Sequence, residues 1–416
     1  MIRTKILPCY LHRNQADELN HASGQIYTGV LVAHWRVVRK HDLWLSEKAT
    51  TRWSDYRTSA PLHSHSIDAA QQGFVKACKT ARALKKLDST TRYPYHPKRY
   101  RTTVWKNTAI RRQKDKLLLS NGAGRPGIEI VIPESLCGVL RFLEVRLVYD
   151  KTACRYNWHI VVENGKQLKV ASDSNIVSVD LGEIHPAVIG DGDSATIITC
   201  RERRHQQQGH AKRHSKLAQA LARKKKGSRR YRKLLRTKTR MKGKHARIMR
   251  DIAHKLSHAV VDEAVKRRAS TIVVGDVRDI ADGVNLGKQN NQKISGWNHG
   301  KLLSYVKYKA TAEGVAVVLQ NERYSSQTCP QCGNRHKPRG RNYNCPSCGF
   351  SGHRDVIGQT NILSLYLYGK PGKLAVPWVI KHREPYSIRS TRRRRDTGQV
   401  SSRPVARANT REATGL

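Results

Sequence analysis

The chain has 416 residues, of which 38% are hydrophobic, so its length and composition predict two or three domains with real cores. Lys and Arg number 79 against 31 Asp and Glu, which gives a formal net charge of +48. This charge opposes compaction unless a polyanion neutralises it, so it favours a phosphate-rich partner and argues against a small-molecule substrate. No apolar run is long enough for a membrane span or signal peptide, and we expect a cytoplasmic, nucleoid-associated protein.

Residues 1–175 mix short apolar alternations with basic stretches, which predicts an antiparallel β-rich domain with a helical insertion at about 40–90. Residues 26–38 fit either a helix or a buried strand, and residues 67–86 read as a basic helix. Alternating apolar positions predict a strand around Ile128–Ile132.

A different pattern begins at residue 176. Strands are expected at 176–182, 195–200, 270–277 and 314–320, with a helix at 299–313. Because strands alternate with helical segments, residues 176–368 are predicted to form an α/β core with parallel strands.

A helical hairpin is predicted over 201–268. Residues 201–250 contain 21 Lys or Arg and a single acid, Glu202. A solvated coiled coil would need matching acids, so this basic surface favours phosphate contacts. Apolar residues recur every four positions and predict one buried face: Ile248, Ile252, Leu256 and Val260.

The last segment, 369–416, is rich in Arg, Ser, Thr, Pro and Gly and contains the run Arg392 to Arg395. This composition cannot bury enough apolar surface to order itself, so we expect a disordered basic tail.

Four of the nine cysteines form two Cys-x-x-Cys pairs with twelve residues between them, each followed by glycine. This spacing aims four thiolates at one ion and predicts a structural tetrahedral Zn²⁺ within an insertion at 325–352. With the shell complete, His336 and His353 are expected to be surface residues or nucleic-acid contacts rather than ligands. Lys337, Arg339 and Arg341 are candidates for phosphate contacts. The predicted zinc ligands are Cys329, Cys332, Cys345 and Cys348.

Acidic residues at strand and helix ends are informative in so basic a chain. Asp180 ends the first core strand, and Asp355 lies at an expected helix start after the second cysteine pair. Phosphodiester hydrolysis uses carboxylates that converge on two divalent ions. Each acid alone is weak evidence, since capping or a salt bridge explains most such residues.

The order of these features resembles the TnpB family of transposon-encoded RNA-guided nucleases, which are ancestral to type V CRISPR effectors. The resemblance covers about residues 176–366. The motifs that carry it are VDLG at 179–182, YSSQTCPQCG at 324–333 and HRD…TNIL at 353–363. The resemblance implies an RNase H-like (RuvC) nuclease core with a zinc-ribbon insertion. It also implies an N-terminal wedge β-barrel carrying a helical recognition insertion.

The resemblance further implies a guide RNA from the transposon end, a double-stranded target DNA recognised beside a short flanking motif, and catalytic Mg²⁺. Asp180 matches the family's first-motif aspartate and Asp355 its third-motif aspartate. The second motif departs from the pattern, because Gly275 stands where the family has glutamate.

Three interpretations of the second motif follow. Asp276 substitutes, although a shift of one residue aims its side chain at the opposite face. Alternatively the acid has moved to Glu322, whose strand should lie about 4.8 Å from the Gly275 strand. Branches of the family have such a relocated glutamate, and we predict Asp180, Glu322 and Asp355 as the magnesium ligands. In the third interpretation the site is inactive. Glu183 is a further candidate but is expected in a turn.

The leading hypothesis is therefore a metal-dependent RNA-guided DNA endonuclease, with specificity carried mainly by base pairing. The alternative is a nuclease-inactive, repressor-like RNA-guided DNA-binding protein. A basic RNA-binding protein of ribosomal type would explain the charge and the cysteines, but not the settings of Asp180 and Asp355.

Overall fold

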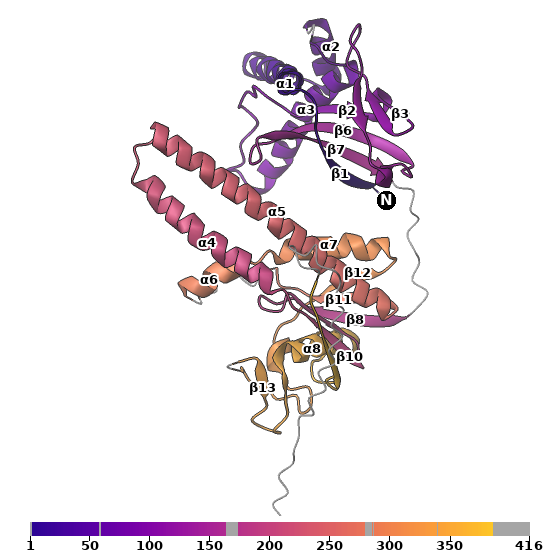
Figure 1. The fold of residues 1–416 in the computed structure, drawn as a ribbon, viewed down its shortest axis with the longest axis vertical. Coiled ribbons are helices and arrows are strands. Elements are labelled where there is room, and N and C mark those ends of the chain that lie inside the picture. The colour runs from indigo at the N-terminus through magenta and orange to yellow at the C-terminus, as the bar shows by residue number, and fades with distance from the viewer. Residues whose placement is uncertain are drawn as a thin grey trace, which may run out of the picture. The chain divides into compact units, whose positions relative to one another are not determined.

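A computed structural model describes residues 2–57, 60–163, 174–278, 285, 287–338 and 340–385, without the side chains of 54–57. The chain divides into two compact units, residues 1–167 and 168–416 (Figure 1). Within the described residues, no helix has both the length and the apolar character needed to cross a membrane.

The first unit contains two antiparallel sheets around one hydrophobic core. The four-stranded sheet has the order β1-β7-β6-β2 and the three-stranded sheet the order β3-β4-β5. The antiparallel β-rich prediction is confirmed, whereas closure into a barrel stays a prediction. The strands are β1 (Ile2–Pro8), β2 (Thr103–Lys106), β3 (Ile110–Gln113), β4 (Lys116–Leu119), β5 (Ile128–Val131), β6 (Arg141–Asp150) and β7 (Arg155–Glu163).

Three helices lie between β1 and β2 in the chain: α1 (Arg13–His41), α2 (Glu47–Arg57) and α3 (Ser64–Leu87). The helical part therefore begins near residue 13, earlier than the predicted 40, and residues 26–38 are helical. Buried Asn20 fixes α1 to the sheet, since its amide donates to the Leu147 carbonyl and accepts from the Thr103 backbone N–H. A strand reading of 26–38 is wrong because α1 buries residues at helical spacing, among them Ile26, Tyr27 and Val30.

The second unit is built on a six-stranded sheet of order β12-β11-β8-β9-β10-β15. β11 runs parallel to β8 and β12, β9 runs antiparallel to β8 and β10, and β15 runs parallel to β10. The α/β prediction is confirmed, with β9 reversed because short turns join it to its neighbours. The strands are β8 (Asn175–Asp180), β9 (Ala187–Gly190), β10 (Ser194–Ile198), β11 (Ala269–Gly275), β12 (Ala316–Gln320) and β15 (Val379–Arg383).

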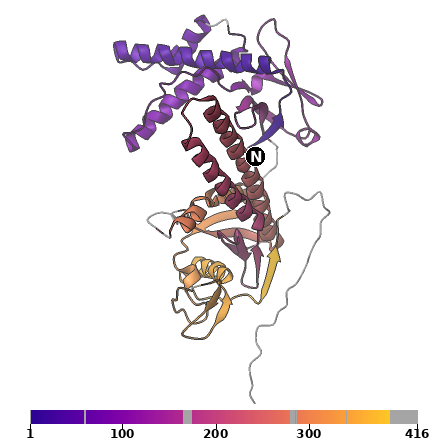
Figure 2. The ribbon, with the colours of Figure 1, turned by 60° about the vertical axis from the view of Figure 1, so that its left-hand side comes forward.

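Helices cover both faces of this sheet (Figures 1 and 2). On one face, Val177 and Val179 of β8 belong to the same core as residues of α5 and α7. On the other face, Val356 of α8 packs with Val188 and Ile197. Successive residues of a strand thus pack into the cores on opposite faces of the sheet, as the pleat requires. The helices are α4 (Arg201–Ala222), α5 (Arg229–Lys266), α6 (Lys288–Ser295), α7 (His299–Ala312) and α8 (Arg354–Tyr368).

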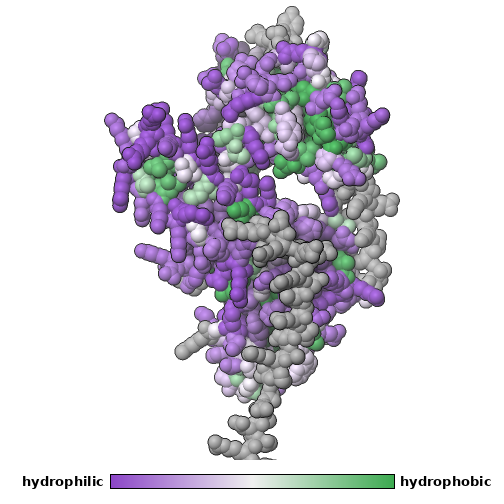
Figure 3. Space-filling model, in the orientation of Figure 1, coloured by the Kyte–Doolittle hydropathy of each residue, from purple (hydrophilic) through white to green (hydrophobic). Residues whose placement is uncertain are grey.

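The predicted helical hairpin is present as α4 and α5, which pack against each other. Ser228 caps α5 by accepting from the Tyr231 N–H, and Gly227 turns the chain with φ of +82°. Ile252, Leu256 and Val260 are buried in the sheet's core, and Ile248 packs against its edge. The exposed side of the hairpin is mostly hydrophilic (Figure 3).

The predicted disordered tail begins too early. Val379–Arg383 forms β15, and Arg383 donates to Asp262 and Glu263 of α5 at 3.0 and 2.8 Å. Composition averaged over a long Arg-rich segment hid these five residues, in which Ile380 packs against a core and Arg383 finds two acids. The remaining part of the predicted tail, 386–416, lies outside the described residues.

Candidate active site and metal centre

Asp180 ends β8 on the face that α8 covers. Ser178, two residues earlier, donates its hydroxyl to the Gln359 carbonyl of α8 at 2.8 Å, and the pleat puts Asp180 on the same face. A Cβ at Gly358 would lie only 2.8 Å from Oδ2 of Asp180. The carboxylate therefore lies directly against the backbone of α8, where a side chain at position 358 would displace it.

Asp355 lies in the first turn of α8, where the helix dipole favours an anion. Fully buried Asn361 fixes the position of this helix, because its Nδ2 donates to the carbonyls of Ser325 and Thr328 at 2.7 and 2.8 Å. Its Oδ1 accepts from the Gly372 N–H at 2.9 Å. Our sequence analysis missed this role of Asn361, because Asn361 is one of several polar residues in the helix and nothing local distinguishes it from Gln359 and Thr360.

Glu322 lies beyond the end of β12, next to the strand that carries Gly275. The register pairs Gly275 with Gln320, which confirms the predicted adjacency of these strands. A Cβ built on Gly275 would collide with Oε2 of Glu322 and lie 2.9 Å from Cδ1 of Ile362. The Glu322 carboxylate thus occupies the space where a side chain at position 275 would begin.

The charges of these acids act on one another. The pKa of Asp180 is raised well above its usual range by burial and then by the negative charges of Glu322 and Asp355, against the opposing charge of Arg354. Burial, with a smaller contribution from Asp276, raises the pKa of Glu322 to about 7. Among the described residues, Glu322 Oε2 is buried without a hydrogen-bond partner. Partly buried carboxylates that repel one another are a chemically suitable setting for a cation.

Asp276 has a different environment. Its carboxylate accepts from Nε of Arg278 at 2.8 Å, and this hydrogen bond is the largest cause of its lowered pKa. The charge of Asp276 acts on Glu322, whereas the charges that raise the pKa of Asp180 belong to Glu322 and Asp355. Of the two candidates for the second-motif acid, Glu322 is the one coupled to Asp180.

Glu183 turns away from this carboxylate cluster. It lies in the loop after β8 and pairs with Arg204 at 3.3 Å and with buried Arg203 at 3.6 Å. This agrees with the expectation that Glu183 lies in a turn, and it gives the acid a role in anchoring that turn to α4.

Two histidines and an arginine surround Asp355. Arg341 donates to Asp355 Oδ2 at 2.6 Å, so it binds this acid in the protein without nucleic acid, and Arg339 lies outside the described residues. His185 and His353 approach Asp355 closely enough that one ligand atom from each residue lies within 4.8 Å of the others. His353 is partly buried, whereas His336 is exposed, and a nucleic-acid contact of either histidine stays a prediction.

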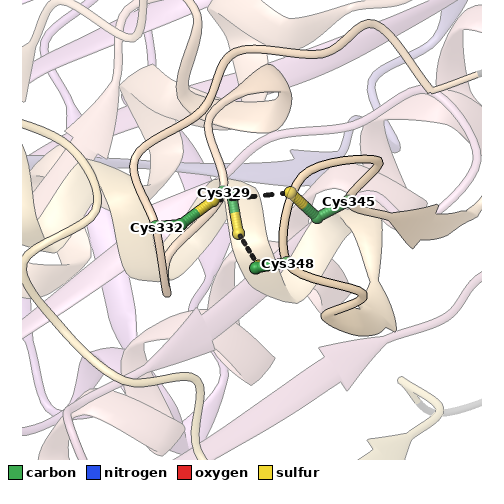
Figure 4. A group of neighbouring side chains, drawn as sticks. All are labelled: Cys329, Cys332, Cys345 and Cys348. Carbon is green, nitrogen blue, oxygen red and sulfur yellow. Dashed lines mark hydrogen bonds between the residues drawn. The ribbon is translucent and has the colours of Figure 1, made fainter.

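The four predicted cysteine ligands form one cluster (Figure 4). Their sulfurs all lie within 4.8 Å of one another, with Cys329 to Cys348 at 3.7 Å and Cys332 to Cys345 at 3.5 Å. Four sulfurs about 2.3 Å from one tetrahedral ion would be separated by about 3.8 Å. Gly333 and Gly349 both have φ of +72°, the left-handed turn after each pair that glycine allows. The cluster can therefore hold a metal ion.

Tyr343 supports this cysteine cluster. It is fully buried with Cys329 and Cys345, and its hydroxyl donates to the Gln327 carbonyl at 3.3 Å. A tyrosine between cysteine pairs could equally stack on a base, and the structure places this ring inside the fold of the insertion.

Two family models match this chain. The model described as a probable transposase matches residues 159–281, and the Cas12f1-like TNB domain matches residues 299–362. The first match begins within β7 and includes β8 to β11. The second covers α7, β12, the cysteine cluster and most of α8. Both parts of the candidate site therefore lie within or beside recognised family regions.

Curated relatives include a TnpB-like protein, MJ0751, of Methanocaldococcus jannaschii, which is 32% identical over 122 residues, or 29% of this chain and 44% of that protein. The Cas12f1 endodeoxyribonuclease of Sulfoacidibacillus thermotolerans is 30% identical over 26% of this chain and 25% of its own. The putative RNA-guided DNA endonuclease InsQ of Escherichia coli is 27% identical over 50% of this chain and 53% of its own. The matches thus span about half of these relatives or less.

Solved structures of similar fold are Cas12 effectors. A Cas12f1 chain from a complex with single-guide RNA and target DNA has a TM-score of 0.56 at 12% identity, over 84% of this chain and 83% of that one. CasPhi-2 bound to crRNA has a TM-score of 0.52 at 10% identity, over 91% and 99%. At this identity the likeness concerns the fold. Together with the family models and curated relatives, it confirms the resemblance to the TnpB family that the order of the sequence motifs indicated.

Proposed function

We propose that this chain is an RNA-guided DNA endonuclease that hydrolyses phosphodiester bonds at Asp180, Glu322 and Asp355. The observation that carries the proposal is the position of Glu322 over Gly275, which brings a third carboxylate to the acids of the first and third motifs. A missing second-motif glutamate would otherwise favour a binding protein without nuclease activity.

The proposed cations are Mg²⁺ ions held by these three carboxylates. The site fits them because the charges of Glu322 and Asp355 raise the pKa of buried Asp180, and because a buried oxygen of Glu322 lacks a hydrogen-bond partner among the described residues. When bound, the ions would supply positive charge that stabilises the attacked phosphate and the leaving oxygen. The protein's part is to fix the carboxylates through Gly275, Gly358 and the Asn361 anchor of α8.

The proposed partners are a guide RNA from the transposon end and a double-stranded DNA target beside a short flanking motif. The basic hairpin α4–α5 supports this, because 21 Lys or Arg within 201–250 form a cation-rich surface suited to a heteroduplex backbone. The relative InsQ is named as a putative RNA-guided DNA endonuclease and the relative Cas12f1 as an endodeoxyribonuclease, which supports RNA and DNA as partners. We assign RNA binding and motif recognition to residues 1–175, and Zn²⁺ binding to the four cysteines as a structural ion.

The test is cleavage of a matched plasmid by the purified full-length protein with guide RNA and Mg²⁺. Asp180→Asn, Glu322→Gln and Asp355→Asn are each expected to reduce cutting by about 10³-fold or more while target binding survives. The matched control Asp276→Asn should cut within a few-fold of the unsubstituted protein.

Two results would overturn the proposal. Loss of cutting in Asp276→Asn but not in Glu322→Gln would assign the second-motif role to Asp276. A matched plasmid that stays bound and intact with every protein would identify a nuclease-inactive DNA-binding protein instead.

A further inference from the structure

His185, His353 and Asp355 bring two imidazoles and a carboxylate together from separate parts of the second unit. His185 lies in the loop between β8 and β9, His353 ends β14 (Ser351–His353), and Asp355 opens α8. One ligand atom from each lies within 4.8 Å of the other two. The proposed hydrolytic site uses Asp355 but neither histidine.

Each histidine is on an anchored segment. A Cβ at Gly182 would lie 2.6 Å from the His185 carbonyl oxygen, so the loop folds tightly back on itself where only glycine fits. The same loop is tied to α4 through Glu183 and Arg204. His353 directly precedes α8, whose position Asn361 fixes through buried hydrogen bonds. The juxtaposition therefore follows from the fold rather than from a free surface side chain.

The imidazoles have unused coordinating atoms. Nδ1 of His185 and Nδ1 of His353 are both buried, and neither has a hydrogen-bond partner in the part of the chain that the structure describes. The two rings are 5.6 Å apart and tilted by 55°. Buried nitrogens without a partner cost free energy unless a water or an ion satisfies them. Two imidazoles that carry such nitrogens and lie beside one carboxylate point to a cation with an affinity for nitrogen.

Arg341 is compatible with such a cation. It donates to Asp355 Oδ2, and the other carboxylate oxygen can bind an ion. Two ligands about 2.1 Å from one ion lie about 3 Å apart at a right angle and about 4.2 Å apart on opposite sides. Ligand atoms within 4.8 Å of one another can therefore reach one ion after the side chains draw together.

We propose that His185, His353 and Asp355 form a mixed nitrogen–oxygen site for a first-row transition dication, with Mn²⁺ as the probe. Imidazole ligands suit first-row ions such as Fe²⁺, Ni²⁺ and Zn²⁺, whereas Mg²⁺ prefers oxygen ligands alone. Mn²⁺ is a demanding probe because it binds carboxylate readily, so nitrogen coupling reports the histidines specifically. Because Asp355 also belongs to the carboxylate site, this inference deepens the proposed function: next to the Mg²⁺ ions held by carboxylates, Asp355 would share a transition dication with the two histidines.

The experiment uses full-length, zinc-loaded protein titrated with Mn²⁺ and followed by electron paramagnetic resonance. The spin-echo modulation of bound Mn²⁺ should show coupling to imidazole nitrogen. His185→Gln and His353→Gln should each weaken Mn²⁺ binding by at least about 10-fold and reduce the nitrogen coupling. The matched control is His336→Gln, which replaces an exposed histidine between the two cysteine pairs. It should change neither the affinity for Mn²⁺ nor the nitrogen coupling.

Mn²⁺ bound without nitrogen coupling, or with unchanged coupling in both variants, would overturn the inference. Retained zinc and an unchanged circular dichroism spectrum show that a variant is folded. If a histidine variant does not fold, the test is the nitrogen coupling of Mn²⁺ in the unsubstituted and Glu322→Gln proteins, both of which keep His185, His353 and Asp355. Failure of the proposed function would look different. If the plasmid stays intact but Mn²⁺ shows nitrogen coupling, the nuclease proposal is wrong and the histidine site stands. If cutting is normal but Mn²⁺ shows no nitrogen coupling, only the histidine site is wrong.

Discussion

The cysteine cluster and the carboxylate cluster both gather ligands suited to a cation, but the chain assembles them differently. Only 19 positions separate Cys329 from Cys348, and two short turns with glycine bring the sulfurs together. The carboxylates instead lie at the ends of β8 and β12 and at the start of α8. Ser178 and Gln359, which hold two of these elements together, are 181 positions apart. The cysteine cluster comes from one short segment and should tolerate changes elsewhere in the fold. The carboxylate cluster instead depends on how β8, β12 and α8 are positioned against one another.

The largest effect is expected where the local site is removed. Substituting Cys329 and Cys345 by Ser leaves too few thiolates to bind the ion. Since metal binding contributes to the free energy of folding, this contribution is lost with the ion. We expect no bound zinc, a melting temperature lower by on the order of 10 °C, and no cutting. Zinc analysis and thermal unfolding measure this. The control is Cys154→Ser, an exposed cysteine of the other unit; an equal loss there would contradict a specific metal role.

A smaller but more diagnostic effect is expected at Gly275. In Gly275→Ala the added methyl group meets the Glu322 carboxylate and Ile362, and the displaced carboxylate should reduce cutting by about 10²-fold. Gly192→Ala is the matched control, since nothing lies within 4 Å of its Cβ.

The same position allows a reciprocal test. The double variant Gly275→Glu with Glu322→Ala restores a glutamate to the usual strand and empties the space it needs. It should recover part of the activity that either single variant loses. Activity in Gly275→Glu alone, with Glu322 still present, would show that the two carboxylates do not share one space.

The smallest effect concerns pH and stability without divalent ions. Burial raises the pKa of Glu322 from 4.5 to about 7, so the folded protein holds a proton that the unfolded chain releases. The free energy of unfolding should therefore fall as pH rises from about 4.5 to about 7, by up to about 3 kcal/mol. Glu322→Gln removes this loss. Its advantage in urea unfolding should be present at pH 8 and absent at pH 4, and an advantage independent of pH would contradict the assignment.

Spacing and periodicity were sufficient for much of this molecule. The cysteine ligands follow from a two-residue spacing, and the buried face of α5 from apolar residues every fourth position. Both depend on neighbours along the chain, so the sequence carries the signal directly. The adjacency of β11 and β12 was instead implied by the resemblance to a family with an RNase H-like sheet.

Three-dimensional contacts were needed for the rest. The site for Glu322 exists because parallel register sets its carboxylate over a residue without a side chain. The meeting of His185 with His353 depends on a loop and a helix that no local pattern connects. β15 is held by parallel pairing with β10 and by the ion pairs of Arg383 with α5, and its Arg-rich surroundings concealed both. Such features belong to pairs of distant residues, and the free energy that fixes them comes from packing between elements rather than from any one segment.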